Sequence, residues 1–392
     1  MKREGRPIRV LHVCTIALTA HTFIAPVARY LSVRGYEVAL ACSTADAPDG
    51  PQLVDDGALS GIPIHHIQIS RSIHPIKDLL AVWKLYRLIK RLRPTIVHTQ
   101  TSKAGIVGRL AARWAGTPVV IHTAHAFPFH QYLPFALRWL YVVIERWAAH
   151  LTDLLIVDTE SVRADGLHFR IVSNSDKLVV VSMGLDLKKF SPAPDPSSVR
   201  QQLGFGHDNL VVGTVARLVP DKGIECFLRM AFEIRKARAD VRFLIVGDGP
   251  LRLELERLAD DLGLREVTVF TGHREQVPRF MESMDVFVLP TRREGFGVVF
   301  AEAMAMGVPV VGSRIGPVAE VVEEGVTGYL SSPDRPDEFA EHVLALLNDE
   351  SKRRAFGKAG RRRVEKYFDE AKMCERIEQL YCRLLEEKMV TV

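Results

Sequence analysis

The sequence predicts an α/β protein made of two Rossmann-like domains that face each other across a ligand cleft. Its 392 residues are too many for one ordinary domain, so two domains are expected. Strand-like and helix-like segments alternate through both halves of the chain, which indicates parallel sheets covered by helices on both faces. A proline-rich stretch over 190–198 separates the halves and is the expected linker.

The first half contains short apolar runs typical of buried parallel strands and longer amphipathic runs typical of helices. We expect strands over 9–14, 37–43, 96–100, 118–122, 154–158 and 178–181. We expect helices over 23–34, 76–92, 104–115 and 137–150. Gly35 and Pro94 end the first two of these helices.

The second half repeats this alternation. We expect strands over 211–214, 242–246, 267–270, 286–289 and 309–312. We expect helices over 224–237, 251–262, 276–282, 298–306 and 338–348. The amphipathic segment 369–388 predicts a last helix that packs on a domain edge. The predicted domains are therefore 1–188, onto which 369–392 crosses back, and 189–368.

Composition limits the class of protein. Hydrophobic residues make up 47% of the chain and charged residues 25%, as in soluble globular proteins. A net charge of +5 is too small to indicate a nucleic-acid partner. The five cysteines are scattered and show no metal-binding spacing, which favours a reducing, cytoplasmic environment over a disulfide framework.

Two segments bear on membrane contact. The aromatic stretch 127–147 is interrupted by Arg138, Glu145 and Arg146, so we expect it to lie along a surface at most and not to span a bilayer. The first interpretation of the basic segment 76–92 is an amphipathic helix of the domain. The alternative is a helix that docks peripherally on an anionic membrane, at the inner face of the cell membrane.

Two acids around a glycine-rich apolar block form the most informative motif. Glu294 lies in a loop, and Glu302 lies eight residues later in the following helix. Glycines let backbone amides approach a ligand closely, and the helix start supplies further amides and a positive dipole end. The residues of this block that we expect at a donor site are Glu294, Gly295, Phe296, Gly297, Val298, Val299 and Glu302.

Cations precede this block in the chain. Arg217 and Lys222 follow a strand that contains Gly213, so both are expected at the carboxyl edge of a sheet, where α/β proteins bind ligands. Fixed cations there would stabilise the charge that develops on a departing diphosphate. With the acids they indicate a pocket for a phosphorylated sugar, most simply a nucleotide-sugar. Taken alone, they would read equally well as two surface cations.

A second glycine-rich turn follows the next strand. Its residues are Gly247, Asp248 and Gly249. The turn lacks the third glycine of a dinucleotide-binding fingerprint, so we interpret it first as a tight turn. The alternative is that its residues line the donor site.

The N-terminal half offers candidates for the acceptor side. Among three histidines after one strand, we expect His122 and His130 to be structural and His125 to contact the reacting sugar or accept a proton. A metal site there is the weakest reading, because no carboxylate or cysteine lies nearby in sequence. Lys103 opens a helix and could bind an acceptor phosphate, although a plain helix cap explains the segment equally well.

These motifs together resemble those of family-4 glycosyltransferases of the GT-B fold. The resemblance covers nearly the whole chain, from the diphosphate site at 213–223 through the acidic block to the segments 307–313 and 324–330. The segments 94–112 and 122–130 are similar to transferases of the bacterial capsular and exopolysaccharide subgroup. Four departures stand out. The loop after Thr15 lacks the usual glycine pair, and Ala126 replaces a glycine. The segment 182–186 (Ser-Met-Gly-Leu-Asp) replaces the common Asn-Gly-Val-Asp, and Pro317 stands where a second glycine is common.

This resemblance implies a retaining hexosyltransferase that uses a nucleotide-sugar, such as a UDP-sugar, as co-substrate and needs no metal or other cofactor. It implies a lipid-linked or oligosaccharide acceptor. Arg217 and Lys222 would stabilise the departing nucleoside diphosphate, Glu302 would bind the ribose, Glu294 would orient the sugar, and His125 would support the reacting face. On the acceptor side it places Thr15, Lys103 and His125.

Other functions stay open at this point. A sugar-nucleotide epimerase or a glycogen-phosphorylase-like enzyme would keep the fold and change the chemistry. A non-catalytic nucleotide-sugar-binding protein would keep the pocket without turnover. A dinucleotide oxidoreductase is disfavoured, because no complete glycine fingerprint opens a helix after a strand.

Overall fold

A computed structural model describes residues 2–3, 6–16, 19–43, 59–70, 74–192, 197–206 and 208–388. The chain divides into two compact units, which we call unit 1 (1–182 and 370–392) and unit 2 (183–369). The middle of the predicted linker, 193–196, and the two residues after Ile16 lie outside the described residues.

Unit 1 is built on a parallel sheet of seven strands in the order β5-β4-β3-β6-β7-β8-β9. Its strands are β3 (Arg9–Ile16), β4 (Glu37–Ser43), β5 (Ile64–His66), β6 (Ile96–Gln100), β7 (Val119–Ala124), β8 (Leu154–Val157) and β9 (Leu178–Val180), preceded by the antiparallel pair β1 (Lys2–Arg3) and β2 (Arg6–Pro7). Its helices are η1 (Ala20–Ile24), α2 (Ala25–Val33), α4 (Pro75–Leu92), α5 (Ser102–Ala115), α6 (Phe135–His150), α7 (Glu160–His168), η2 (Ser175–Lys177) and α16 (Glu370–Glu387).

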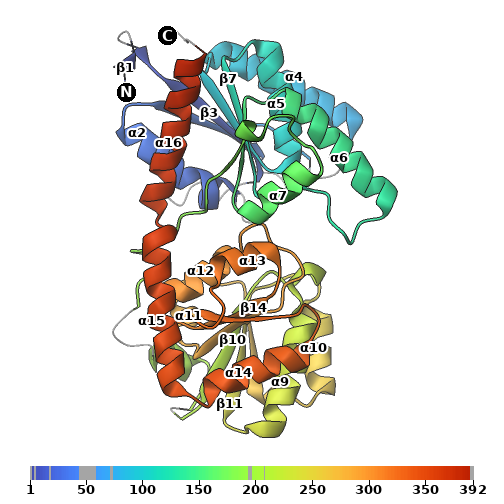
Figure 1. Ribbon diagram of the computed structural model, residues 1–392, viewed down its shortest axis with the longest axis vertical. Coiled ribbons are helices and arrows are strands. Elements are labelled where there is room, and N and C mark those ends of the chain that lie inside the picture. Colours follow the sequence, from blue (N-terminus) through green and yellow to red (C-terminus); the bar gives the residue numbers. More distant parts are fainter. Residues whose placement is uncertain are drawn as a thin grey trace. The chain divides into compact units, whose positions relative to one another are not determined.

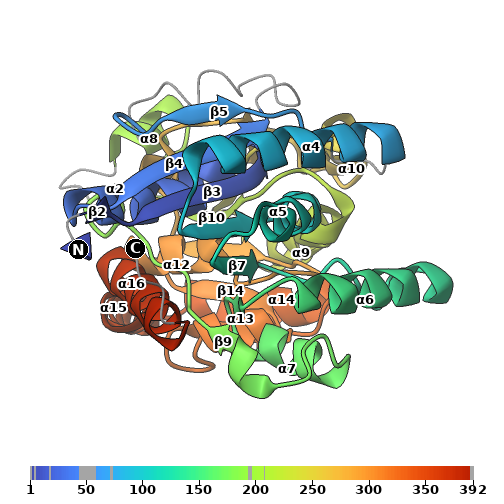
Figure 2. The ribbon, with the colours of Figure 1, turned by 90° about the horizontal axis from the view of Figure 1, so that it is seen from above.

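Helices cover both faces of this sheet (Figures 1 and 2). On one face, apolar residues of α4 and α5 pack on β3, β6 and β7, and α6 continues the layer over β8. On the other face, α16 packs against α2. The His98 side chain of β6 points to this face, where its Nδ1 lies 2.6 Å from the Tyr381 hydroxyl of α16. The last helix of the chain is therefore a structural part of unit 1.

Unit 2 is built on a second parallel sheet, of six strands in the order β12-β11-β10-β13-β14-β15. Its strands are β10 (Leu210–Val215), β11 (Val241–Val246), β12 (Thr268–Gly272), β13 (Val286–Leu289), β14 (Val310–Ser313) and β15 (Gly328–Ser331). Its helices are α8 (Ser197–Gln202), η3 (Pro220–Lys222), α9 (Ile224–Ala237), α10 (Arg252–Asp261), η4 (Arg265–Val267), α11 (Val277–Glu282), α12 (Val298–Ala305), α13 (Gly316–Val321), α14 (Pro336–Leu347) and α15 (Glu350–Tyr367).

Each sheet has one point where the strand order reverses direction. In unit 2 the chain moves outward from β10 through β11 to β12 and then returns to place β13 on the other side of β10. In unit 1 the same reversal occurs between β3 and β6. Ligands of parallel α/β sheets bind at such points, beyond the carboxyl ends of the strands. The predicted α/β fold is confirmed, and these two reversals locate the candidate sites.

Candidate functional site

An ion pair lies at the reversal point of unit 2. Lys222 follows β10 at the end of η3, and Glu294 follows β13 in the loop before α12. The Lys222 Nζ donates to Glu294 Oε1 over 2.5 Å, and the carboxylate is only 11% exposed. The structure thus brings together a predicted cation and a predicted acid that are far apart in the sequence.

The loops that carry this pair are held together by backbone contacts. Gly223 has a positive φ of 64°, and a Cβ there would lie 2.0 Å from the Pro290 carbonyl oxygen. The Thr291 hydroxyl donates to the carbonyls of Asp221 and Arg293, both at 3.0 Å. Only glycine permits this approach, so Gly223 fixes the spacing between the Lys222 loop and the Glu294 loop.

Arg292 adds a second connection between the same loops. Its guanidinium donates to the Pro220 carbonyl, to Glu225 and to Asp334. These partners raise the Arg292 pKa above its ordinary value, chiefly through the hydrogen bond to Asp334. The sequence reading did not single out Arg292, because its partners come from three separate segments.

Arg217 follows β10 at the same edge of the sheet, and its side chain is exposed. No carboxylate among the described residues pairs with it. Its loop is pressed against the glycine-rich turn after β11. A Cβ at Gly247 would lie 1.9 Å from the Ala216 carbonyl oxygen, and one at Gly249 would lie 2.5 Å from that of Leu218. The Leu218 amide also donates to the Asp248 carbonyl over 3.0 Å. The two glycines therefore support the loop that presents Arg217.

Gly213 has a different position. It lies inside β10, where a Cβ would lie 2.4 Å from the Met284 sulfur. The structure accounts for this glycine by its close packing against Met284.

The start of α12 presents backbone amides. Gly297 caps the helix with a φ of 86° and no side-chain cap, so the first-turn amides of Val298 and Val299 have no acceptor within the helix. Gly295 lies in the loop before this cap, and the Phe296 ring is buried against Phe368, with ring centroids 5.2 Å apart. Phe296 therefore anchors the loop, and the first-turn amides of α12 remain available to donate to an anion.

Glu302 lies one turn further along α12 and differs from Glu294. No group among the described residues donates a hydrogen bond to its carboxyl. Burial raises its pKa from 4.5 to about 7, and the positive charge of Lys189 opposes part of that shift. A carboxyl so placed is ready to accept hydrogen bonds from the hydroxyls of a bound molecule.

In unit 1, the carboxyl ends of three adjacent strands bring polar side chains around His125. The His125 Nδ1 lies 2.9 Å from Asp158 Oδ2, beyond β8, and its Nε2 lies 3.3 Å from Gln100 Oε1, at the end of β6. The ring stacks on Phe23 with centroids 4.2 Å apart. The His125 side chain is 21% exposed and that of Asp158 only 3%. A buried carboxylate therefore contacts Nδ1 while part of the ring reaches solvent.

Thr15 and Lys103 are placed near the reversal point of unit 1. The Thr15 hydroxyl lies 2.6 Å from that of Thr101, which has a positive φ of 65° although it is β-branched. Lys103, on the first turn of α5, donates to Asp78 of α4 over 2.5 Å. Lys103 is thus paired with a carboxylate of a neighbouring helix, as Lys222 is paired with Glu294 in unit 2.

The other histidines of the motif are not arranged around a metal. His122 is buried, with its Nδ1 2.9 Å from the Thr99 hydroxyl, and burial lowers its pKa well below 6.5. A Cβ at Gly105 would lie 2.4 Å from the His122 ring, so α5 packs directly on it. In the part of the chain that the structure describes, no group of three or more His, Cys, Asp or Glu side chains could hold a metal ion.

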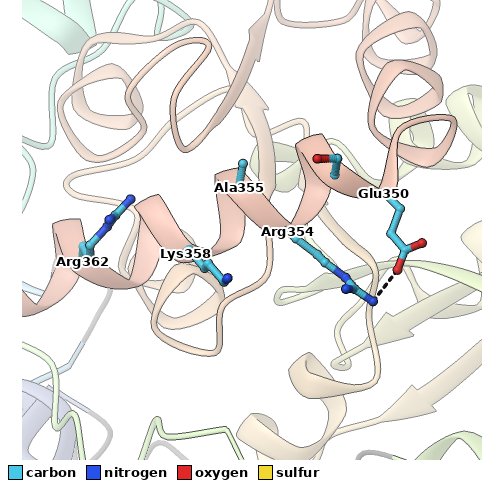
Figure 3. A pocket seen from close by; sticks show the side chains of 6 residues that line it. Glu350, Arg354, Ala355, Lys358 and Arg362 are labelled. Atoms are coloured by element: carbon cyan, nitrogen blue, oxygen red, sulfur yellow. Dashed lines mark ion pairs between the residues drawn. The ribbon is translucent and has the colours of Figure 1, made fainter.

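A hollow of about 580 Å³ on α15 is separate from these residues. It is lined by Glu350, Ser351, Arg354, Ala355, Lys358 and Arg362 (Figure 3). Glu350 pairs with Arg354 at 2.5 Å, which leaves a basic surface from Lys358 to Arg362. None of the predicted site residues lines it.

Sequence reasoning missed Gln100, Asp158 and Phe23 as partners of His125. Gln100 and Asp158 end predicted strands, and polar residues at the ends of adjacent parallel strands meet at one sheet edge. Their positions were therefore the signal that could have identified them. The adjacency of β6, β7 and β8 had to be known first. Taken together, unit 2 offers an exposed cation, an ion pair, helix amides and a carboxyl without a partner, an assembly that can bind an anion carrying hydroxyl groups.

Comparison with protein families gives two matches. The model described as "Glycosyl transferases group 1" matches residues 197–363, and the one described as "Glycosyl transferase 4-like domain" matches residues 19–184.

Two characterised bacterial proteins are similar to the chain over most of its length. The UDP-Gal:alpha-D-GlcNAc-diphosphoundecaprenol alpha-1,3-galactosyltransferase of Escherichia coli is 31% identical over 327 residues, which is 82% of this chain and 83% of that protein. The capsular polysaccharide biosynthesis glycosyltransferase CapM of Staphylococcus aureus is 31% identical over 336 residues, which is 82% of this chain and 86% of that protein.

Among solved structures, Anabaena Alr3699/HepE in complex with UDP has a TM-score of 0.81 and 22% identity, and the match covers 96% of this chain and all of that one. The same protein with UDP and glucose has a TM-score of 0.82. At this level of identity, the likeness establishes a shared fold.

Proposed function

The chain belongs to the family-4 glycosyltransferases (glycosyl transferases group 1) of the GT-B fold, and from that premise we propose its donor, acceptor and stereochemistry. The donor is a UDP-sugar, the transferred group is a hexose or N-acetylhexosamine, and the anomeric configuration is retained. The acceptor is a lipid-linked or oligosaccharide intermediate of a cell-envelope polysaccharide. The choice of UDP is supported by the Escherichia coli relative, a UDP-Gal transferase, and by the Anabaena structure in complex with UDP.

The observation that carries this proposal is the Lys222–Glu294 ion pair at the reversal point of unit 2. The pair fixes a cation where a diphosphate would lie, and it directs a carboxylate to the same place, where it can accept hydrogen bonds from sugar hydroxyls. Arg217 adds a second cation, the α12 amides add donors, and Glu302 accepts from the ribose. Because these groups are held before substrate binds, little reorganisation is needed when charge develops on the leaving group.

In the proposed reaction the bond between the anomeric carbon and the phosphate oxygen breaks while the acceptor oxygen bonds to the same face of that carbon. The acceptor proton passes to the departing phosphate oxygen, and Arg217 and Lys222 stabilise the resulting nucleoside diphosphate. His125, held by Asp158, contacts the reacting sugar. Thr15 lies on the acceptor side, and no metal or other cofactor takes part. We place this reaction at the cytoplasmic face of the membrane, with the protein bound peripherally.

A donor screen tests the proposal. UDP release from UDP-Gal, UDP-Glc and UDP-GlcNAc, with GDP-Man as the competing nucleotide class, should be measured with and without a lipid-diphosphate-linked acceptor. We expect turnover of one UDP-sugar, and we expect Lys222→Ala or Glu294→Ala to lower kcat/KM by at least about a hundredfold while the fold is kept. Lys236→Ala is a matched control, since Lys236 pairs with Glu233 on the surface of α9.

Several outcomes would contradict the proposal. Turnover of GDP-Man alone would overturn the choice of nucleotide. Full activity of both pocket variants would overturn the site. Release of an inverted product, seen as the anomeric coupling constant in proton NMR, would overturn retention.

A further inference from the structure

The outward surface of α6 in unit 1 is apolar along its whole length. Five large apolar side chains there are between 47% and 81% exposed. They are Phe135, Trp139, Leu140, Val143 and Trp147, and we call them the α6 apolar face. Four of the five are spaced four residues apart, so they form one line about 18 Å long on the helix.

Of the charged residues of α6, Glu145 lies on the inward side, whereas Arg138 and Arg146 are partly exposed beside the apolar face, with the Arg146 guanidinium 5.0 Å from the Trp139 ring centroid. Glu145 is 2% exposed and accepts from the fully buried Arg109 over 3.1 Å. The Arg146 Nε donates to the Phe169 carbonyl over 2.9 Å, and the Arg138 guanidinium lies over the Phe169 ring. The outward surface of a helix in water normally carries mostly polar side chains, so a row of large exposed apolar side chains indicates a non-aqueous partner.

Helix α4 lies on the other side of α5 from α6 and adds exposed apolar side chains and cations to the same side of unit 1. Its exposed apolar side chains include Leu79, Leu80 and Trp83. Its exposed cations are Lys77, Lys84, Arg87, Lys90 and Arg91. The one acid of α4, Asp78, is paired with Lys103. Helices α4, α5 and α6 cover the same face of the sheet (Figure 2), and α5 adds an exposed Trp114 between them.

We propose that the α6 apolar face inserts into the interfacial layer of an anionic lipid bilayer while the cations of α4 bind the headgroups. This inference rests on the proposed function, which places the acceptor in a membrane, and it names the element that makes the contact. Tryptophan is favoured at the boundary between water and lipid, and lysine and arginine bind anionic headgroups. The α4 cations favour an anionic bilayer over a second copy of the same basic surface. Within the described residues, no helix is both long and apolar enough to cross a bilayer, so contact of this kind is in the plane of the surface.

Vesicle flotation with the full chain tests the proposal. The probes are phosphatidylcholine vesicles with about 30% phosphatidylglycerol, and phosphatidylcholine vesicles alone. We expect binding to the anionic vesicles and a blue shift of tryptophan emission. The Leu140→Ser/Val143→Ser double variant should bind at least about tenfold more weakly. The matched control is Leu253→Ser/Val326→Ser, which removes the same residue types at exposed positions of unit 2 and should bind like the wild type.

The outcomes separate this inference from the proposed function. UDP-sugar turnover with a short water-soluble acceptor should be equal in the wild type and the α6 variant, because neither residue belongs to the donor site. Equal vesicle binding by both double variants would overturn the inference, and so would loss of binding only in a Lys358→Glu/Arg362→Glu variant of α15. Absence of wild-type binding would also overturn it. A concentration-dependent dimer that the α6 variant abolishes would assign the face to a second copy instead.

Discussion

The two acids of the donor block differ in their surroundings, and this difference has consequences at the scale of single residues. Glu294 forms an ion pair with Lys222, whereas Glu302 has no hydrogen-bond donor among the described residues and a pKa raised by burial to about 7. Because an ionised carboxylate accepts hydrogen bonds from ribose hydroxyls more strongly than a protonated acid does, donor binding should depend on the ionisation of Glu302.

We therefore predict that UDP affinity rises with pH between about 6 and 8 in the wild type, and that Glu302→Gln is weaker and insensitive to pH in this range. Isothermal titration at several pH values measures both. The free energy of unfolding should depend on pH in the opposite direction to UDP affinity. Since the folded pKa exceeds the ordinary value of 4.5, the stability that this carboxyl contributes is present below pH 4.5 and is lost as pH rises through about 7.

Thermal unfolding checks that sign. The Tm of the wild type minus the Tm of Glu302→Gln should fall as the pH is raised from 5 to 8, because only the wild type has an ionisable group at this position. A constant difference, together with a pH-independent UDP affinity in the wild type, would show that Glu302 does not titrate in this window.

At His125, we predict that Asp158→Asn lowers kcat/KM by about 10- to 100-fold with little effect on UDP affinity. The carboxylate fixes the orientation and tautomer of the ring through its contact with Nδ1, and an amide does so less well. The readout that separates positioning from general destabilisation is the pH profile of kcat, which should change shape in the variant. Wild-type kcat and an unchanged profile would exclude this role.

At the scale of elements, the donor site depends on how closely two loops approach. Gly223 and Gly263 both have positive φ, of 64° and 67°, but only Gly223 has a neighbouring carbonyl where a Cβ would be. We predict that Gly223→Ala costs at least about 2 kcal/mol more than Gly263→Ala, measured by urea unfolding, and that it also lowers activity. Equal costs would mean that the η3 loop tolerates displacement.

The sequence predicted most of the elements in both sheets because buried parallel strands are continuous apolar runs between amphipathic helices. It missed α15, an 18-residue helix, because most of its residues are charged and only a few are buried. Its close packing depends on glycines, since a Cβ at Gly357 would lie 2.0 Å from the Gly307 carbonyl oxygen. The short elements α13 and β15 were missed because four to six residues carry too little periodicity.

Part of the site was predictable for the same reason. Arg217, Lys222, Glu294 and His125 follow strands, and parallel strands end at a common edge. The pairing of Lys222 with Glu294 and of His125 with Asp158 was not predictable, because it depends on which strands are neighbours. The sequence also gave no sign that Lys103 would be paired with Asp78 of a different helix.

For the whole molecule, the donor proposal assigns nucleotide binding to unit 2. We predict that UDP slows amide hydrogen exchange most strongly at 216–223 and 294–302, and that it raises the Tm of that unit. Saturation at 100 times the Kd would add about 2.7 kcal/mol. Hydrogen-exchange mass spectrometry resolves the two units. Protection confined to residues of unit 1 would contradict the assignment.

Helix α16 gives the chain an unusual order of assembly during translation. The seven-stranded sheet emerges from the ribosome first, yet the helix that supplies Tyr381 to its buried His98 is made only after all of unit 2. Unit 2 can complete its fold while one face of the earlier sheet is covered by η1 and α2 but not yet by α16. Nascent chains of this protein should therefore expose an apolar patch for most of their synthesis, and they should depend on chaperones until translation reaches the last helix.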